Sequence, residues 1–158
     1  MNSKIKTYII GILIPLAVGG ISALLTSGSM DIYQSINNPP LAPPPIVFPI
    51  VWTILFTLMG ISSAMIYNTE SAPLPQRKSA LYTYALSLIF NFFWSIIFFG
   101  GRAYLFAFIW LIILWILILG TIKKYLKINP LAAYLQIPYL LWVTFAGYLN
   151  FAIWILNR

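Results

Sequence analysis

The sequence predicts an all-α integral membrane protein, a bundle of five transmembrane helices. Of its 158 residues, 61% are hydrophobic and 17% aromatic, while only 7% are charged. Soluble domains carry roughly 25% charged residues. Nine basic and two acidic side chains are too few to cover the exterior of a soluble fold of this size. The bilayer is therefore the expected solvent.

Long uncharged runs supply the spans. Four runs each provide the about 20 apolar residues that cross a hydrocarbon core, and a fifth apolar segment follows a proline-rich stretch. The first run could also be interpreted as a secretory signal, but it is longer than the apolar core of such a signal, so we expect it to be a span. Short connections favour antiparallel neighbours in one domain over residues 1–158. The expected spans cover about residues 6–25, 46–67, 79–99, 104–125 and 130–156.

The first span and the segment after it differ in composition. Gly11, Gly19 and Gly20 lie in the first span, where small side chains let neighbouring helices approach closely. Residues 26–45 follow, and they contain five of the eleven prolines. Residues 26–45 are therefore expected to form a loop over the mouth of a pocket, and because proline fixes its own φ and lacks a backbone donor, we expect residues 38–45 to be its stiff extended lid.

The remaining spans have recognisable boundaries. The second begins directly after the prolines and tolerates Pro49 in its first turn, and Gly100 and Gly101 end the third. In the fifth, we expect Pro138 to produce a kink, because it leaves the carbonyl of Tyr134 without its usual donor. No internal repeat is visible, so an inverted-repeat transporter has no support.

The basic residues are distributed asymmetrically. Arg102 and Arg158 fall on one side of the membrane, and the other seven fall on the opposite side. The positive-inside rule then places the N-terminus in the cytoplasm and the C-terminus outside, in a multi-pass protein of a bacterial cytoplasmic membrane. The net charge of +7 thus encodes orientation and does not predict nucleic-acid binding. The seven are Lys4, Lys6, Arg77, Lys78, Lys123, Lys124 and Lys127.

Missing residue types exclude several kinds of chemistry. The sequence has no cysteine and no histidine, which removes disulfides, thiol chemistry, histidine bases and histidine-ligated haem. We expect no cofactor and no metal. The two acidic residues, Asp31 and Glu70, fall in loops, whereas ion-coupled carriers usually need a carboxylate within the membrane.

Aromatic residues and amides recur at helical spacing in three spans, so each set shares one helix face. Such stripes favour a cavity for a planar ligand, because ring stacking contributes about 0.5–1.5 kcal/mol beyond buried area. Packing is the alternative, and Asn91 and Asn150 also suit interhelical hydrogen bonds. Tyr125 is expected at the lipid interface. The stripes are Phe48, Trp52, Phe56, Met59 and Ser63; Asn91, Trp94, Ser95 and Phe98; and Pro138, Trp142, Phe145 and Leu149.

Several blocks of sequence resemble one known family. YQSINNPPLAPPPIVFPIVWT at 33–53, with the Met-Gly pair at 59–60, resembles the first loop and second helix of the TspO family. NFFWSIIFF at 91–99 resembles its third-helix motif, and IPYLLWVTFAGYLNFAIWILN at 137–157 its fifth helix. The family is also called translocator protein, tryptophan-rich sensory protein or peripheral benzodiazepine receptor. The blocks span most of the chain in the family's order.

The resemblance implies a membrane receptor or carrier, commonly a homodimer, with a pocket in the cytosol-distal half under the first loop. It implies binding of porphyrins such as protoporphyrin IX and of benzodiazepine-type ligands. Trp52, Asn91 and Trp142 fall on the family's pocket positions. With the stripes, the candidate ligand-binding residues are Tyr33, Pro43, Pro44, Phe48, Trp52, Phe56, Asn91, Trp94, Ser95, Phe98, Trp142, Phe145, Ala146 and Leu149.

Two other functions stay open at this point. Bacterial members of the family are associated with light-dependent porphyrin breakdown, which would make Trp52 and Trp142 candidate catalytic residues. A structural or accessory membrane subunit is the other possibility. Sterol binding is discounted, because Phe151 and Ile155 replace the tyrosine and arginine of the family's sterol motif, which is a weak signal even when intact.

Overall fold

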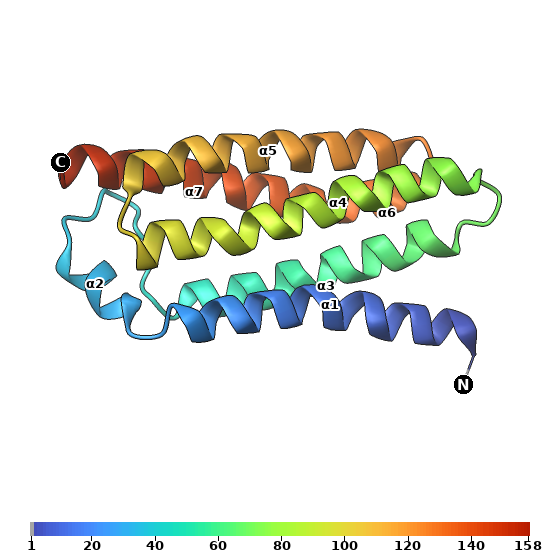
Figure 1. The fold of residues 1–158 in the computed structure, drawn as a ribbon, viewed down its shortest axis with the longest axis horizontal. Coiled ribbons are helices and arrows are strands. Elements are labelled where there is room, and N and C mark those ends of the chain that lie inside the picture. Colours follow the sequence, from blue (N-terminus) through green and yellow to red (C-terminus); the bar gives the residue numbers. More distant parts are fainter. Residues whose placement is uncertain (1) are drawn as a thin grey trace.

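The computed structural model describes residues 2–158, and these residues form helices and loops without a strand. Four long helices and a broken fifth lie side by side, with the two termini at opposite ends of the bundle (Figure 1). A π-helical segment, Ile96–Gly100, continues α4. The α-helices are α1 (Ser3–Leu25), α2 (Ser29–Ser35), α3 (Val47–Asn68), α4 (Leu74–Ser95), α5 (Tyr104–Leu126), α6 (Pro130–Leu135) and α7 (Ile137–Leu156).

Five helices are long and apolar enough to cross a membrane, which confirms the predicted multi-pass fold. They are α1, α3, α4 with its π-helical extension, α5, and α6 together with α7. Their outer faces expose large aliphatic side chains, such as Leu13, Ile54, Ile116 and Leu141. In lipid such side chains meet a solvent as apolar as themselves, so this surface suits a bilayer.

The segment between the first two spans is only partly extended. Residues 29–35 form the helix α2, which the prediction of a loop over 26–45 did not include. Gly28, at φ 87°, provides the left-handed turn before this helix. Residues 29–35 contain no proline, so a helix can form there, and Asp31 in its first turn interacts favourably with the helix dipole. Extended backbone begins at Ile36.

Two further boundaries differ from the prediction. α4 begins at Leu74 and not near residue 79, because Pro75 occupies the first turn, where a missing N–H has no helical partner to lose. The fifth predicted helix is divided at Gln136 into α6 and α7. Pro138 lies in the first turn of α7, so the expected kink takes the form of a short break.

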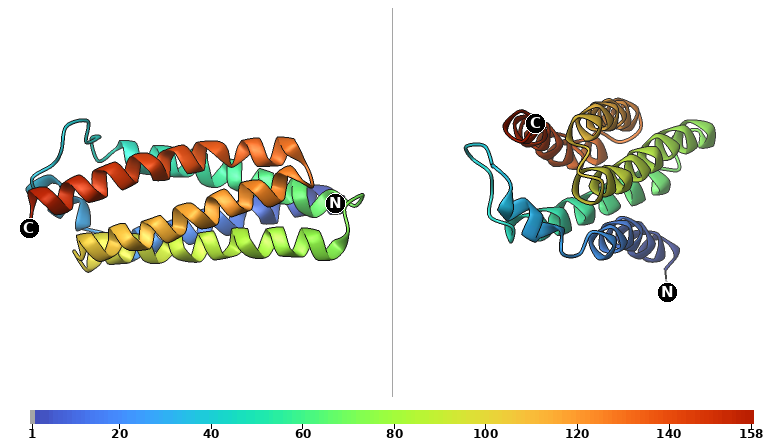
Figure 2. Two further views of the ribbon diagram at one scale, coloured as in Figure 1. Left: turned by 90° about the horizontal axis from the view of Figure 1, so that it is seen from above. Right: turned by 60° about the vertical axis from the view of Figure 1, so that its left-hand side comes forward.

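Glycines set the separation of α1 and α3. A Cβ atom on Gly60 would lie 2.4 Å from the backbone oxygen of Gly11 and 2.5 Å from Cα of Ile12. The two backbones therefore touch at this crossing, as small residues allow in membrane helices. α1 lies at the edge of the bundle beside α3 (Figure 2).

Tyr125 does not lie at the lipid interface, so that prediction was wrong. Its side chain is fully buried, and its hydroxyl shares a 2.8 Å hydrogen bond with Oγ of Ser63 on α3. A tyrosine can be buried when its hydroxyl finds a partner, and Ser63 provides that partner from a neighbouring helix.

Candidate functional site

A cavity of about 610 Å³ lies inside the end of the bundle where α2 and the C-terminus are found. Its walls come from α1, α3, α4 and α7, and α2 with its flanking loops closes the end; α5 contributes no lining residue. The lining residues are Leu16, Gly19, Gly20, Ser22, Ala23, Thr26, Ser27, Gly28, Met30, Tyr33, Pro45, Ile46, Phe48, Pro49, Trp52, Thr53, Phe56, Asn91, Trp94, Ser95, Phe98, Phe99, Trp142, Ala146, Leu149, Asn150 and Ile153.

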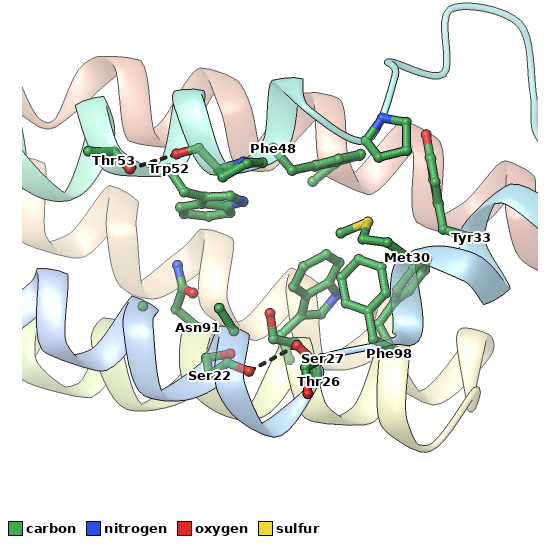
Figure 3. Close-up of a pocket in the computed structure, with 18 of the residues that line it drawn as sticks. Ser22, Thr26, Ser27, Met30, Tyr33, Phe48, Trp52, Thr53, Asn91 and Phe98 are labelled. Carbon is green, nitrogen blue, oxygen red and sulfur yellow. Dashed lines mark hydrogen bonds between the residues drawn. The ribbon is translucent and has the colours of Figure 1, made fainter.

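Aromatic rings on α3 form one wall. Trp52 stacks on Phe56, with ring centroids 5.2 Å apart and planes inclined by 28°. One turn earlier, Phe48 makes edge contacts with Tyr33 at 5.3 Å and with Trp142 of α7 at 6.2 Å. This arrangement follows from the spacing of four residues, which places all three α3 rings on one helix face. Figure 3 shows Trp52 and Phe48 along the same side of the cavity.

Trp94 on α4 is held in place by Asn150 of α7. Its ring stacks on Phe98 at 5.2 Å, and its Nε1 donates to Oδ1 of Asn150 on α7 at 3.0 Å. Nδ2 of Asn150 in turn donates to the carbonyl of Tyr104 at 2.7 Å. Asn150 therefore links three helices, and both ends of its amide are occupied.

Asn91 differs from Asn150 because one end of its amide is free. Its Nδ2 donates to the hydroxyl of Tyr139 at 3.1 Å. No hydrogen bond within residues 2–158 reaches its Oδ1, although only 5% of the residue is exposed. Figure 3 shows the amide directed into the space beneath Trp52. The carbonyl oxygen of Asn91 is therefore an acceptor available to a molecule in the cavity.

Tyr33 of α2 connects the lid to the cavity. Its hydroxyl donates to the carbonyl of Pro43 at 2.9 Å, and its own carbonyl accepts from Nδ2 of Asn38 at 2.8 Å. Burial raises the pKa of the Tyr33 phenol above its usual range, so the hydroxyl remains a donor at neutral pH. Tyr33 thereby fixes the proline-rich segment against α2.

The lid is also attached to the C-terminal end of α7. The backbone N–H of Asn37 donates to Oδ1 of Asn157 at 2.9 Å, and Nδ2 of Asn157 donates to the carbonyl of Asn37 at the same distance. The hydroxyl of Tyr148 donates to the carbonyl of Pro40 at 2.7 Å. Nδ2 of Asn37 also donates to the carbonyl of Leu156 at 3.4 Å, so four hydrogen bonds hold residues 37–40 to the C-terminal half of α7 and its cap.

Replacing Asn157 by alanine is expected to loosen the lid. The change removes both reciprocal hydrogen bonds to Asn37, each worth about 0.5–1.5 kcal/mol, and leaves the Tyr148 bond in place. Hydrogen–deuterium exchange should become several-fold faster in residues 36–44. Arg158→Ala is the control, because Arg158 lies over the ring of Trp154 and not against the lid. Equal exchange in the two variants would contradict this role for Asn157.

The cavity takes in most of the candidate residues named from the sequence. Tyr33, the candidates on α3, α4 and the π-helical segment, and all candidates on α7 except Phe145 line it, with Trp52, Asn91 and Trp142 converging from three helices. Pro43, Pro44 and Phe145 do not line it. The sequence analysis missed the contribution of α1 and of residues 26–30. Gly19 and Gly20 belong to this part of the wall, but small residues in a span indicate close helix packing equally well.

The side chains that line the cavity are uncharged. Rings, aliphatic groups and a few hydroxyls and amides make up the wall, and no charged side chain is among the lining residues. Within residues 2–158, no three histidine, cysteine, aspartate or glutamate side chains gather as they would around a metal ion. The arrangement suits an apolar, flat molecule with a polar edge.

The chain is similar to known proteins along its whole length. The model of the TspO/MBR family matches residues 11–155. A tryptophan-rich protein TspO of Chlorobaculum tepidum is 35% identical over 99% of both chains. The translocator protein of Homo sapiens is 34% identical over 77% of this chain and 72% of its own, and a tryptophan-rich sensory protein of Cereibacter sphaeroides is 33% identical over 79% and 76%. The chain therefore belongs to the TspO/MBR family.

Proposed function

We propose that this protein is a membrane receptor or carrier that binds porphyrins, such as protoporphyrin IX, and benzodiazepine-type ligands in the cavity. The observation that carries the proposal is the convergence of Trp52, Asn91 and Trp142 on one uncharged space. The relatives' names support a receptor or sensory role.

Size and lining agree with a planar ligand. A cavity of about 610 Å³ falls within the roughly 300–1,000 Å³ usual for sites of small organic molecules. The stacked pair Trp52 and Phe56 presents a flat surface on which a conjugated ring can lie. Oδ1 of Asn91 can accept a hydrogen bond from a ligand N–H, such as that of a pyrrole.

The proposal includes the orientation of the protein in the membrane and its oligomeric state. The N-terminus and the loops after α3 and α5 lie at one end of the bundle, and the C-terminus and the loop before α5, which contains Arg102, lie at the other (Figure 1). The positive-inside rule then directs the lid and the cavity away from the cytoplasm of a bacterial cell. We expect a homodimer, built through the exposed apolar helix faces in the bilayer.

Replacing Asn91 by alanine should weaken porphyrin binding about three- to tenfold, because a hydrogen bond contributes about 0.5–1.5 kcal/mol. Titration of the purified protein with protoporphyrin IX, followed by tryptophan fluorescence, should saturate near one ligand per chain. Asn129→Ala is the matched control, since Asn129 lies far from the cavity and bonds Thr69. If Asn91→Ala binds as the control does, the assignment of Asn91 fails.

If no planar ligand binds to the wild-type protein or raises its thermal midpoint, a structural or accessory membrane subunit becomes the better account of its function.

A second candidate function is light-dependent porphyrin breakdown. The observation that favours it is the presence of oxidisable indoles in the wall of the same cavity, those of Trp52 and Trp142 together with that of Trp94. Illumination of the porphyrin complex should then give a new product band. If the porphyrin bleaches as fast in Trp52→Phe and Trp142→Phe as in the wild type, the protein binds porphyrin without degrading it.

A further inference from the structure

A group of polar side chains is buried between the spans, outside the cavity. We call Ser62, Ser63, Tyr84, Tyr125 and Gln136 the polar cluster. Ser62 donates to the carbonyl of Ala132 at 2.6 Å and accepts from Nε2 of Gln136 at 3.2 Å. Ser63 shares a hydrogen bond with Tyr125 at 2.8 Å, and the ring of Tyr84 lies 6.5 Å from that of Tyr125. Four helices, α3, α4, α5 and α6 with its C-cap, thus meet around these groups.

Two atoms of the polar cluster have no hydrogen-bond partner within residues 2–158. They are the hydroxyl of Tyr84 and Oε1 of Gln136. Tyr84 is 6% exposed and Gln136 is fully buried. Among the residues that the structure describes, Ser62 is the one partner of the Gln136 amide group. If the amide were rotated by 180°, Oε1 would face Ser62 and Nε2 would be the unpaired atom. The third unpaired atom, Nδ2 of Asn68, belongs to a half-buried residue at the end of α3, outside the cluster.

Unpaired polar atoms are costly inside a membrane protein, because neither lipid nor apolar side chains can replace the lost hydrogen bonds. Buried water is the usual partner in such places, and it typically makes about three hydrogen bonds. A cation would need a compensating negative charge, and the only acidic residues, Asp31 and Glu70, lie in α2 and in the loop after α3. The chemistry of the cluster therefore favours a neutral ligand that both donates and accepts.

We propose that the polar cluster is an internal water-binding site. Water there accepts from the Tyr84 hydroxyl and from whichever of the Ser63 and Tyr125 hydroxyls does not donate to the other, and a further water donates to Oε1 of Gln136 beside Ser62. Each of these atoms has lone pairs or a proton left after the bonds described.

The site is coupled to the cavity through one turn of α4. The hydroxyl of Tyr139, which accepts from Asn91 in the cavity wall, donates to the carbonyl of Ser87 at 3.5 Å. Oγ of Ser87 donates to the carbonyl of Tyr84 at 2.7 Å. These hydrogen bonds therefore lead from Asn91 to the backbone of the α4 turn that carries Tyr84, whose hydroxyl lies in the cluster. Water bound in the cluster supports this turn, which also carries the Ser87 carbonyl that accepts from Tyr139.

The test compares thermal midpoints of the purified full chain in detergent. Tyr84→Phe removes the hydroxyl and keeps the ring, so a water bound there loses a partner. The midpoint should fall by about 2–4 °C, the shift typical for loss of one hydrogen bond in a chain of this size. Tyr82→Phe is the matched control on the same helix, because Tyr82 is 67% exposed, and its midpoint should not change. If the site is dry, removing an unpaired hydroxyl leaves the midpoint of Tyr84→Phe unchanged or raises it, which would overturn the proposal.

A crystal structure of the wild type at about 2 Å or better gives a second, independent readout. The proposal predicts ordered water density within hydrogen-bond distance of the Tyr84 hydroxyl and of Gln136 Oε1. Absence of density at both atoms, or contacts near 2.4 Å in the coordination of a cation, would contradict it even if Tyr84→Phe failed to fold.

Discussion

Gly60→Ala is expected to lower the thermal midpoint of the protein by about 2–12 °C. The added Cβ would lie 2.4 Å from the backbone oxygen of Gly11, and backbone cannot turn aside as a side chain can. α1 must then move away from α3. Overpacking of this kind costs about 1–3 kcal/mol, and each kcal/mol corresponds to about 2–4 °C in a chain of this length. Thermal unfolding in detergent measures the effect.

The same variant should also weaken ligand binding. Leu16 and Gly19 of α1 line the cavity, so a displaced α1 alters one wall. Gly20→Ala is the control for stability only, since Gly20 itself lines the cavity. Nothing lies within 4 Å of the Cβ it would add, and alanine is the better helix former. Its midpoint should stay the same or rise. Equal midpoints in Gly60→Ala and Gly20→Ala would show that the close crossing of α1 and α3 does not determine stability.

Trp52→Ala is expected to reduce porphyrin affinity by about tenfold or more. The indole stacks on the ring of Phe56 and makes an edge contact with Tyr139, with ring centroids 6.3 Å apart. Its removal takes away the flat surface for the ligand, and central aromatic contacts are commonly worth about 2 kcal/mol. Affinity is measured by quenching of the remaining tryptophans on addition of protoporphyrin IX.

Trp115→Ala distinguishes a specific effect from loss of any tryptophan. Trp115 lies on α5, outside the cavity, and its Nε1 donates to Thr144 at 2.9 Å. Affinity should remain within about twofold of the wild type in this variant. A comparable loss of affinity in Trp115→Ala and Trp52→Ala would place the ligand elsewhere or reveal a general defect.

The sequence predicts the spans and three walls of the cavity for simple physical reasons. Uncharged runs of the length of a bilayer have few other uses, and the spacing of Phe48, Trp52 and Phe56 forces a common face on any helix. These features are local in the chain. The same is true of the crossing at Gly11, where small residues indicated a close helix contact before the structure showed its partner, Gly60.

Features that depend on a distant partner could not be predicted in this way. Tyr125 looks like an interfacial residue until Ser63 of α3 is placed beside it. Gly19 and Ser22 carry no pattern that distinguishes a cavity wall from a packing face. The attachment of the lid rests on Asn37 and Asn157, which are 120 residues apart in the sequence.

The most direct test of the binding site is a crystal structure of the protein with protoporphyrin IX bound. The proposed function predicts density for the macrocycle inside the cavity, against the Trp52 and Phe56 rings and within hydrogen-bond distance of Asn91. Density for the ligand only on the outer surface of the bundle, for example in the shallow groove between α5 and α7 near Trp115 and Gly147, would contradict it.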